Sequence, residues 1–254
     1  MRNFRYRFGY ITDPGNRRSS NQDSLLIRTG TCLGKECLLA AVADGMGGMQ
    51  RGDWASCTAV SLLDRWWTER LPGFVGETLA WDALCDSLVV TLEEINWTIC
   101  TDSQDKDGRA GTTMSLMFFH GNRYLLLHVG DSRIYRVGRG GAVQLTRDQT
   151  WCQQELDAGR MTPAEAAVHP MRHALVSTLG VEPQFRLQRE EGTVVSGNAF
   201  LLCSDGFYQE FDVRAWKKVD DPQPLLEQAR DAVKQGPAGD NLTAVLIAVT
   251  ATWR

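Results

Sequence analysis

The sequence predicts an α+β protein in which two antiparallel sheets pack together and helices cover the outside. Strand-like runs open the chain and return in its middle as an antiparallel meander, and two long amphipathic helical stretches lie between these sets. A parallel sheet would alternate strands with helices, and this order does not. Because 254 residues contain no Pro/Gly/Ser-rich linker, we expect one domain spanning residues 1–254.

The first half of the chain supplies three strands and two helices. The expected strands are the apolar-rich runs at residues 4–12, 24–28 and 36–43. The expected helices carry apolar side chains at helical spacing and cover residues 53–70 and 78–101. Pro72 and Gly73 separate these helices.

The second half returns to strands around one insert. The meander strands are expected at residues 112–119, 123–129, 133–137 and 142–145. Residues 148–182 predict short helices, one of them beginning at Thr162 with Pro163 at its first position and Glu165 completing a capping box. We interpret this stretch as an inserted lid. The remaining expected elements are strands at 184–190 and 199–203, a helix at 222–235 and a strand at 242–250.

Composition excludes several classes of function. The net charge of -4 gives no basic face for nucleic acid and no block of like charge for a membrane surface. No apolar stretch approaches the roughly 20 residues that cross a bilayer, and the first residues alternate aromatics with arginines, as a strand does. Seven irregularly spaced cysteines, mostly in apolar runs, predict core residues in a reducing cytosol. We expect a soluble, cytoplasmic monomer.

Four aspartates stand at the edges of apolar runs that are far apart in the chain. They are Asp23, Asp44, Asp205 and Asp240. If they converge, each carboxylate pair repels by about 3 kcal/mol at about 5 Å and an effective dielectric constant near 20. Such a cluster persists only around divalent cations, so the layout predicts a metal-loaded hydrolase.

Each segment alone has a plainer interpretation. Asp44 precedes a glycine-rich loop that is equally consistent with a tight turn and with a metal site. A dinucleotide loop is disfavoured because Gln50 occupies the position of the third glycine. Asp205 follows a strand and Asp240 precedes one, so antiparallel strands could bring them to the same end.

Four further residues carry competing interpretations. Arg18 is either a solvated arginine or a planar fork that matches two phosphate oxygens. Asp131 is equally consistent with a hairpin turn and with a third metal site. His169 and His173 have the spacing of zinc ligands on a helix, but Pro170 lies between them and no H-E-x-x-H glutamate is present.

Together these segments resemble the bacterial PPM (PP2C-type) metal-dependent Ser/Thr protein phosphatases over essentially the whole chain. The matching segments are Arg18 and residues 21–23, 42–48, 111–113, 130–133, 204–206 and 239–241. The resemblance implies a four-layer α-β-β-α sandwich with a flap at residues 148–182. It also implies hydrolysis of phosphoserine and phosphothreonine by a hydroxide held between two Mn²⁺ or Mg²⁺ ions, without a phosphoenzyme.

The resemblance also assigns roles by motif. Asp44 would bridge both ions, Gly45 would offer its carbonyl, and Asp205 and Asp240 would hold one ion. Asp23 would act through bound water and Arg18 would hold the substrate phosphate. Asp131, with Asp205, would contribute to a third, weaker site. Oxygen ligands in this number favour Mn²⁺ or Mg²⁺ over softer metals.

Three positions depart from the family pattern. Gln22 replaces a glutamate, Gln209 replaces an aspartate near the third metal, and Met46 replaces the histidine of animal members. The implied partners are phosphorylated proteins, with a Hanks-type kinase as the natural counterpart. Two other functions remain open: a catalytically silent signalling scaffold, and a sporulation-type phosphatase that acts on an anti-sigma antagonist.

Overall fold

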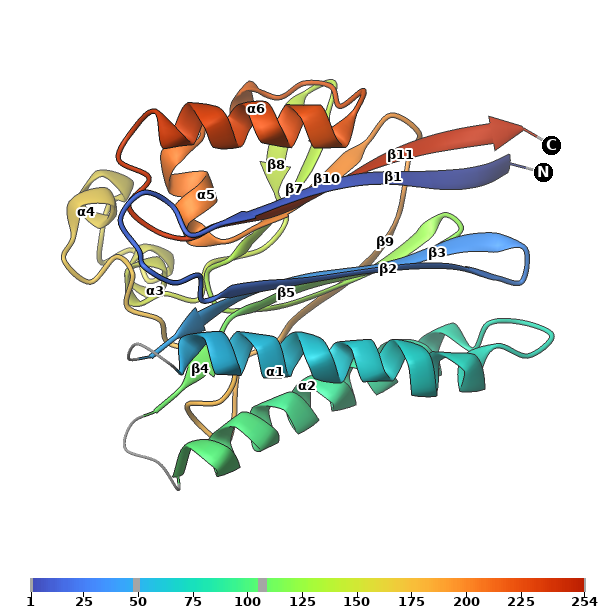
Figure 1. Ribbon diagram of the computed structural model, residues 1–254, viewed down its shortest axis with the longest axis horizontal. Coiled ribbons are helices and arrows are strands. Elements are labelled where there is room, and N and C mark those ends of the chain that lie inside the picture. Colours follow the sequence, from blue (N-terminus) through green and yellow to red (C-terminus); the bar gives the residue numbers. More distant parts are fainter. Residues whose placement is uncertain (1, 48–50, 105–108, 254) are drawn as a thin grey trace.

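The structure, a computed structural model, describes residues 2–47, 51–104 and 109–253 of the chain. Two antiparallel sheets lie face to face, and helices cover the outer face of each sheet (Figure 1). The predicted four-layer α-β-β-α arrangement is confirmed.

The first sheet contains five strands in the order β1-β11-β10-β7-β8. Its strands are β1 (Arg2–Asp13), β7 (Arg133–Gly138), β8 (Gly141–Gln144), β10 (Ala199–Cys203) and β11 (Leu242–Trp253). β1 and β11 pair along their whole length, with Asp13 opposite Leu242. The two ends of the described chain therefore meet in one antiparallel pair.

The second sheet follows the order β2-β3-β5-β6-β9, with a short strand β4 added beside β3. Its strands are β2 (Asp23–Cys32), β3 (Lys35–Met46), β4 (Gly111–Thr112), β5 (Met114–His120), β6 (Arg123–Val129) and β9 (Gln188–Thr193). Every residue of β5 is buried, because this strand has a layer on each face. Its continuous apolar sequence follows from that position.

Helices α1 (Gly52–Arg65) and α2 (Trp81–Gln104) cover the second sheet, and α5 (Asp205–Glu210) and α6 (Pro222–Lys234) cover the first (Figure 1). Helices α3 (Trp151–Asp157) and α4 (Pro163–Val168) form the flap, and the predicted capping box of Thr162 and Glu165 is present. The remaining turns are η1 (Trp66–Arg70), η2 (Leu71–Phe74) and η3 (Val213–Ala215). None of the helices in the described ranges has the length and apolar character needed to cross a membrane.

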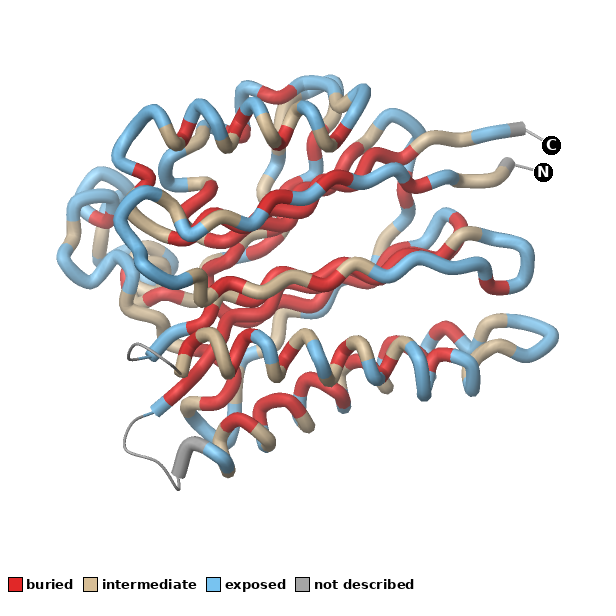
Figure 2. Tube along the Cα trace, in the orientation of Figure 1, coloured by how far each residue is buried: buried red, intermediate tan, exposed pale blue. Residues whose placement is uncertain are grey.

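The described residues form three large apolar cores and one small cluster that includes Val233. Neighbouring residues of one strand pack into different cores. Leu38 packs between the sheets with Phe119 and Phe200, whereas Leu39 packs under α1 and α2. A third core lies between the first sheet and α6, which contributes Leu226. Figure 2 shows the result, with buried residues concentrated along the strands and on the inward sides of the helices.

The structure corrects several predicted boundaries. The strand predicted at residues 184–190 is wrong for its first four residues, because β9 begins at Gln188. In that segment the N–H of Arg186 donates to Ser177 Oγ at 2.8 Å, so the backbone bonds to the flap instead of to the sheet. The helix predicted at residues 53–70 becomes a π-helical turn after Arg65.

Two other expectations also need correction. Asp205 follows a strand, as expected, but it is also the first residue of the short helix α5, which the sequence did not predict. The expectation that the cysteines are core residues holds for five of them, whereas Cys57 is exposed and Cys100 is partly exposed.

Candidate metal centre

The β2–β3 hairpin places Asp23 directly opposite Asp44. The backbone of Asp44 is fixed from the other side by Thr113, because its N–H donates to Thr113 Oγ1 at 3.0 Å and its carbonyl accepts from Thr113 N–H at 2.9 Å. Both carboxylates therefore lie at the same end of the second sheet. This is the end at which α1 begins.

Gly45 is required by close backbone packing at this end. A Cβ on Gly45 would lie 2.0 Å from the carbonyl oxygen of Gly52 and 2.6 Å from that of Gln22. The glycine therefore lets the start of α1 and the loop before β2 approach the residue after Asp44. Gly48 to Gln50, the end of the glycine-rich motif, lie outside the described residues.

The first sheet brings Asp205 and Asp240 to the same place. β10 and β11 are antiparallel, with Cys203 opposite Ala244, so the residues that follow β10 meet those that precede β11. A Cβ on Gly206 would lie 2.3 Å from the carbonyl oxygen of Asn241 and 3.1 Å from Asp240 Cβ. The predicted convergence of these strand ends is present.

A buried hydrogen bond joins the two sheets here. Ser204 Oγ donates to Asp23 Oδ2 at 2.8 Å, whereas Asp23 Oδ1 is buried and has no hydrogen-bond partner. A buried carboxylate oxygen without a donor is destabilising unless a cation satisfies it. The donor set at this end therefore fits a hard divalent ion.

Burial and mutual repulsion raise the pKa values of several of these carboxylates. Burial, followed by repulsion from Asp23 and Asp205, raises the pKa of Asp44 well above its ordinary value. Burial raises the pKa of Asp23 to about 7, and burial with the charge of Asp205 raises the pKa of Asp131 to about 8. The pKa of Asp205 is also raised, first by burial and then by Asp240. Cations bound at this end would offset both the cost of burying the charges and the repulsion between them.

Arg18 lies at the exposed mouth of this cluster. Its Nη2 donates to Asp240 Oδ2 at 2.8 Å, and about half of its side chain is exposed. The bond to Asp240 raises the pKa of Arg18, with smaller contributions from Asp205 and Asp44. The structure thus brings Arg18 close to Asp240. Arg18 lies in a loop whose position the spacing of the sequence motifs does not predict.

The flap adds His173, which the sequence marked only as part of a disfavoured zinc pair. Asp131, His173 and Asp205 offer ligand atoms that all lie within 4.8 Å of one another, and no other trio of such side chains in the described ranges does so. His173 Nδ1 lies 3.9 Å from Asp205 Oδ2. The zinc-helix pattern was rightly disfavoured, because His169 and His173 flank a turn. No local signal marks His173, because its place depends on how the flap folds back.

Two of the residues that depart from the family pattern, Gln209 and Gln22, form hydrogen bonds near the aspartates. Gln209 Nε2 donates to Asp205 Oδ2 at 2.8 Å, so a neutral amide stands where a further carboxylate was expected. Gln22 N–H donates to Asn241 Oδ1 at 2.9 Å, which ties the loop before Asp23 to the loop that carries Asp240. Met46 is exposed at the end of β3.

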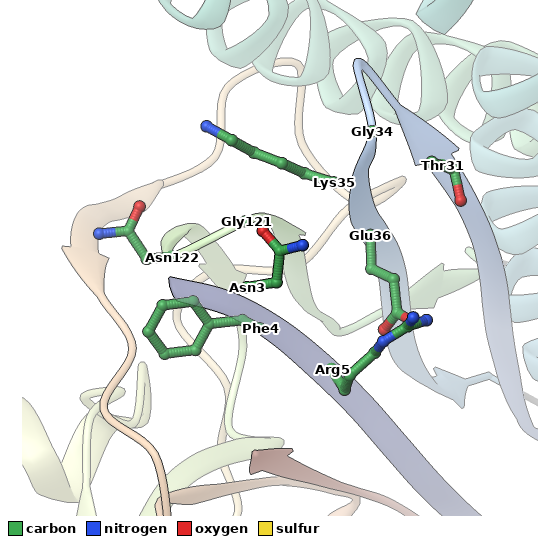
Figure 3. Close-up of a pocket in the computed structure, with 9 residues that line it drawn as sticks. All are labelled: Asn3, Phe4, Arg5, Thr31, Gly34, Lys35, Glu36, Gly121 and Asn122. Atoms are coloured by element: carbon green, nitrogen blue, oxygen red, sulfur yellow. The ribbon is translucent and has the colours of Figure 1, made fainter. Parts of the chain in front are cut away.

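A pocket of about 300 Å³ lies at the opposite end of the sandwich, between β1 and the turns that follow β2 and β5 (Figure 3). The Glu36 carboxylate in its lining already pairs with Arg5 and accepts a hydrogen bond from the N–H of Tyr6 at 2.9 Å. This pocket is therefore separate from the aspartate cluster and offers no matching set of ligands.

Comparison with known proteins decides the family. Residues 16–246 match the family described as protein phosphatase 2C. The chain belongs to the protein phosphatase 2C family. This membership agrees with the resemblance drawn from the sequence motifs.

Relatives of this protein phosphatase 2C member include bacterial Ser/Thr phosphatases. It is 31% identical over 249 residues to the serine/threonine protein phosphatase PstP of Mycobacterium tuberculosis, covering 94% of this chain and 44% of PstP. The chain thus spans less than half of that relative. It is also 31% identical to the protein phosphatase PhpP of Streptococcus pneumoniae, covering 94% of this chain and 96% of PhpP.

Solved structures of phosphatases share the fold of this protein phosphatase 2C chain. The S. agalactiae serine/threonine phosphatase superposes with a TM-score of 0.83 at 26% identity, covering 96% of this chain and 99% of that one. The catalytic domain of PstP in complex with two manganese ions superposes with a TM-score of 0.78 at 27% identity, covering 97% of this chain and 99% of that one. Divalent metal binding is therefore supported for the family.

Proposed function

We propose that this chain is a metal-dependent protein phosphatase that hydrolyses phosphoserine and phosphothreonine in proteins. The observation that carries the proposal is the convergence of Asp23, Asp44, Asp205 and Asp240 from two sheets at one end of the sandwich. Burial and neighbouring carboxylates raise the pKa values of Asp23, Asp44 and Asp205. Such a cluster destabilises the fold when it is empty and suits divalent cations.

Each residue of the cluster has a proposed role. Asp44, the Gly45 carbonyl, Asp205 and Asp240 would hold two Mn²⁺ or Mg²⁺ ions, with Asp23 supporting them, as the family motif implies. Bound there, the ions would supply Lewis acidity toward the phosphoryl group and lower the pKa of water. The Ser204–Asp23 hydrogen bond joins the two sheets at this end, and the Thr113 bonds fix the backbone of Asp44 within the second sheet.

Arg18 is proposed to bind the substrate phosphate. Its guanidinium already lies at the mouth of the cluster, where it pairs with one carboxylate oxygen of Asp240. A planar guanidinium can donate two parallel hydrogen bonds to phosphoryl oxygens and can offset their charge as the transition state forms. Its exposure leaves it free to exchange Asp240 for the substrate.

The remaining assignments are part of the same proposal. The substrates would be phosphoproteins of a Ser/Thr kinase in the cytoplasm, and the chain would work as a single catalytic domain and a monomer. Asp131 would add a third metal site with Asp205. The family membership of PstP and PhpP supports the substrate class.

The test is hydrolysis of matched phosphoserine, phosphothreonine and phosphotyrosine peptides by the purified chain in Mn²⁺. We expect phosphate release from the first two, and loss of release in Asp44→Asn. Calorimetry with Mn²⁺ separates the alternatives: a scaffold would bind no Mn²⁺ and release no phosphate, whereas a sporulation-type phosphatase would prefer a folded antagonist protein over these peptides. Undiminished hydrolysis by Asp44→Asn would refute the proposal.

A further inference from the structure

The flap histidine His173 sits where its imidazole can reach the acidic cluster. Its Nδ1 lies 3.9 Å from Asp205 Oδ2, which is too long for a hydrogen bond. Two atoms that each bond a first-row divalent ion at about 2.1 Å lie no more than about 4.2 Å apart. The distance between His173 and Asp205 is thus within the limit for two ligands of one ion.

The backbone holds His173 in this position. Trp151 N–H donates to the carbonyl of Ala174, and Val176 N–H donates to the carbonyl of Gln149, each at 2.8 Å. Gln149 in turn bonds Gly130 twice, through its N–H at 2.8 Å and its side-chain oxygen at 3.0 Å. Gly130 directly precedes Asp131. The residues after His173 are therefore coupled to the loop that carries Asp131.

Asp131 gives independent support for a cation at this position. It is 5% exposed, and within the described ranges no other residue donates a hydrogen bond to its carboxylate. Arg133, the nearby cation, is committed elsewhere: it pairs with Asp148 at 2.6 Å and stacks over the ring of Tyr208 at 3.7 Å. A buried carboxylate left in this state is strongly destabilising unless an ion satisfies it.

Other features of the site leave the imidazole free to bind. The described part of the chain offers no hydrogen bond to the His173 ring, which is about half exposed. Gln209 occupies Asp205 Oδ2 as a neutral donor and adds no negative charge. A third ion held by Asp131 and Asp205 alone would have two carboxylates, and His173 would complete a three-ligand set.

We propose that His173 is a nitrogen ligand, carried by the flap, to a divalent ion that Asp131 and Asp205 also hold, so that this ion fastens the flap to the catalytic end. The inference rests on the proposed function, since Asp131 and Asp205 belong to the metal centre proposed above, and it adds the flap ligand. Imidazole favours borderline ions such as Co²⁺ and Zn²⁺, whereas sites made of carboxylates and water suit Mg²⁺. The third site should therefore prefer Co²⁺ over Mg²⁺ more strongly than the core pair does.

The test is Co²⁺ titration of the full chain, followed by calorimetry and by the visible absorption of the bound ion. We expect three ions per chain in the wild type. His173→Ala and His173→Ser should keep two of them and bind the third about 10- to 100-fold more weakly, since even residues that only orient a ligand have effects of that size. The visible absorption of the third Co²⁺ ion should also differ between the wild type and the His173 variants, because one of its ligands is lost.

His169→Ala is the matched control. This second flap histidine stacks on Trp151 with ring centroids 5.0 Å apart, so its loss disturbs the flap without removing a ligand. It should titrate as the wild type does. Hydrogen exchange of residues 151–177 should slow on addition of Co²⁺ in the wild type and in His169→Ala, and should be unchanged in His173→Ala.

The outcomes separate this inference from the proposed function. Equal affinity for the third ion in His173→Ala and the wild type, or binding of only two ions by the wild type, would overturn the role of His173 while peptide hydrolysis persists. Failure of the wild type to bind any ion or to release phosphate would instead overturn the proposed function itself.

Discussion

At the scale of single residues, the metal-binding role proposed for the aspartates comes with a cost to stability. Asp44 is partly buried and surrounded by carboxylates, so its charge is unfavourable in the absence of cations. Groups whose pKa is raised by folding stabilise the protein at low pH, and this stability is lost as the pH rises through the folded pKa. With Asp23 near 7 and Asp131 near 8, the window runs from about pH 4 to about pH 8.

Asp44→Asn should therefore separate stability from activity. We expect the chelated variant to melt at least about 3 °C higher than the chelated wild type at pH 8, because it removes an unfavourable buried charge. The same variant should lose about 100-fold or more of its phosphatase activity. Thermal unfolding in excess chelator, with Asp86→Asn as an exposed control on the surface, measures the first effect. A lower melting temperature in Asp44→Asn than in the control would contradict the electrostatic argument.

Arg18→Ala tests the phosphate-binding role. Because the guanidinium would bind phosphate in the ground state and the transition state, we expect KM for a phosphopeptide to rise about 10-fold or more while kcat falls less. Arg17→Ala, at the neighbouring exposed position, should behave as the wild type. Steady-state kinetics decide the point, and a large fall in kcat with unchanged KM would argue against substrate binding by Arg18.

His128 gives an independent pH dependence away from the metal ligands. It is fully buried, its Nε2 has no hydrogen-bond partner, and burial lowers its pKa to about 4. A depressed pKa contributes stability that is present above the unfolded value of about 6.5 and lost as the pH falls toward 4. At 1.36 kcal/mol per unit, the loss is about 3 kcal/mol.

His128→Gln should remove this dependence. The amide can still bond Ser115 Oγ, which lies 3.0 Å from His128 Nδ1, and it does not titrate. We predict that the free energy of unfolding of the wild type, relative to the variant, falls by about 3 kcal/mol between pH 7 and pH 4. Urea unfolding at several pH values measures this difference. Parallel pH profiles for the two proteins would show that His128 is not buried in its neutral form.

At the scale of elements, the centre depends on how closely the end of β3 approaches the start of α1. Gly45→Ala would place a Cβ 2.0 Å from the carbonyl oxygen of Gly52, so backbone must move. We expect destabilisation of about 2 kcal/mol or more, together with weaker Mn²⁺ binding. Gly140→Ala is the matched control, because a Cβ there meets nothing within 4 Å. Equal unfolding midpoints for the two variants in urea would contradict the close packing.

The sequence predicted helices and strands well where apolar residues recur periodically. It predicted their boundaries less well where hydrogen bonds between distant segments determine where an element begins. The apolar run at residues 36–43 became the buried centre of β3, and the capping box at Thr162 formed. The strand start at residue 184 was wrong because Arg186 bonds Ser177 in the flap, a contact between segments that no local pattern encodes. The short helix α5 was missed because six residues are too few for a periodic signal.

At the scale of the whole molecule, antiparallel topology explains why the four aspartates could be foreseen. A strand that ends at an aspartate and a neighbour that begins after one bring both to the same edge, as β10 and β11 do. The position of His173 beside Asp205 could not be foreseen, because it depends on the flap folding back through Gln149 and Gly130. Contacts between an insert and a strand end leave no mark in sequence spacing.

The central claim is that carboxylates from both sheets hold the cations on which phosphate hydrolysis depends. The most direct measurement is phosphothreonine-peptide hydrolysis after exhaustive chelation, followed by Mn²⁺ titration with the bound ions counted in the same sample. We predict that hydrolysis disappears on chelation and returns only once at least two ions are bound per chain. Hydrolysis that survives chelation, or returns in full with a single ion, would contradict the account.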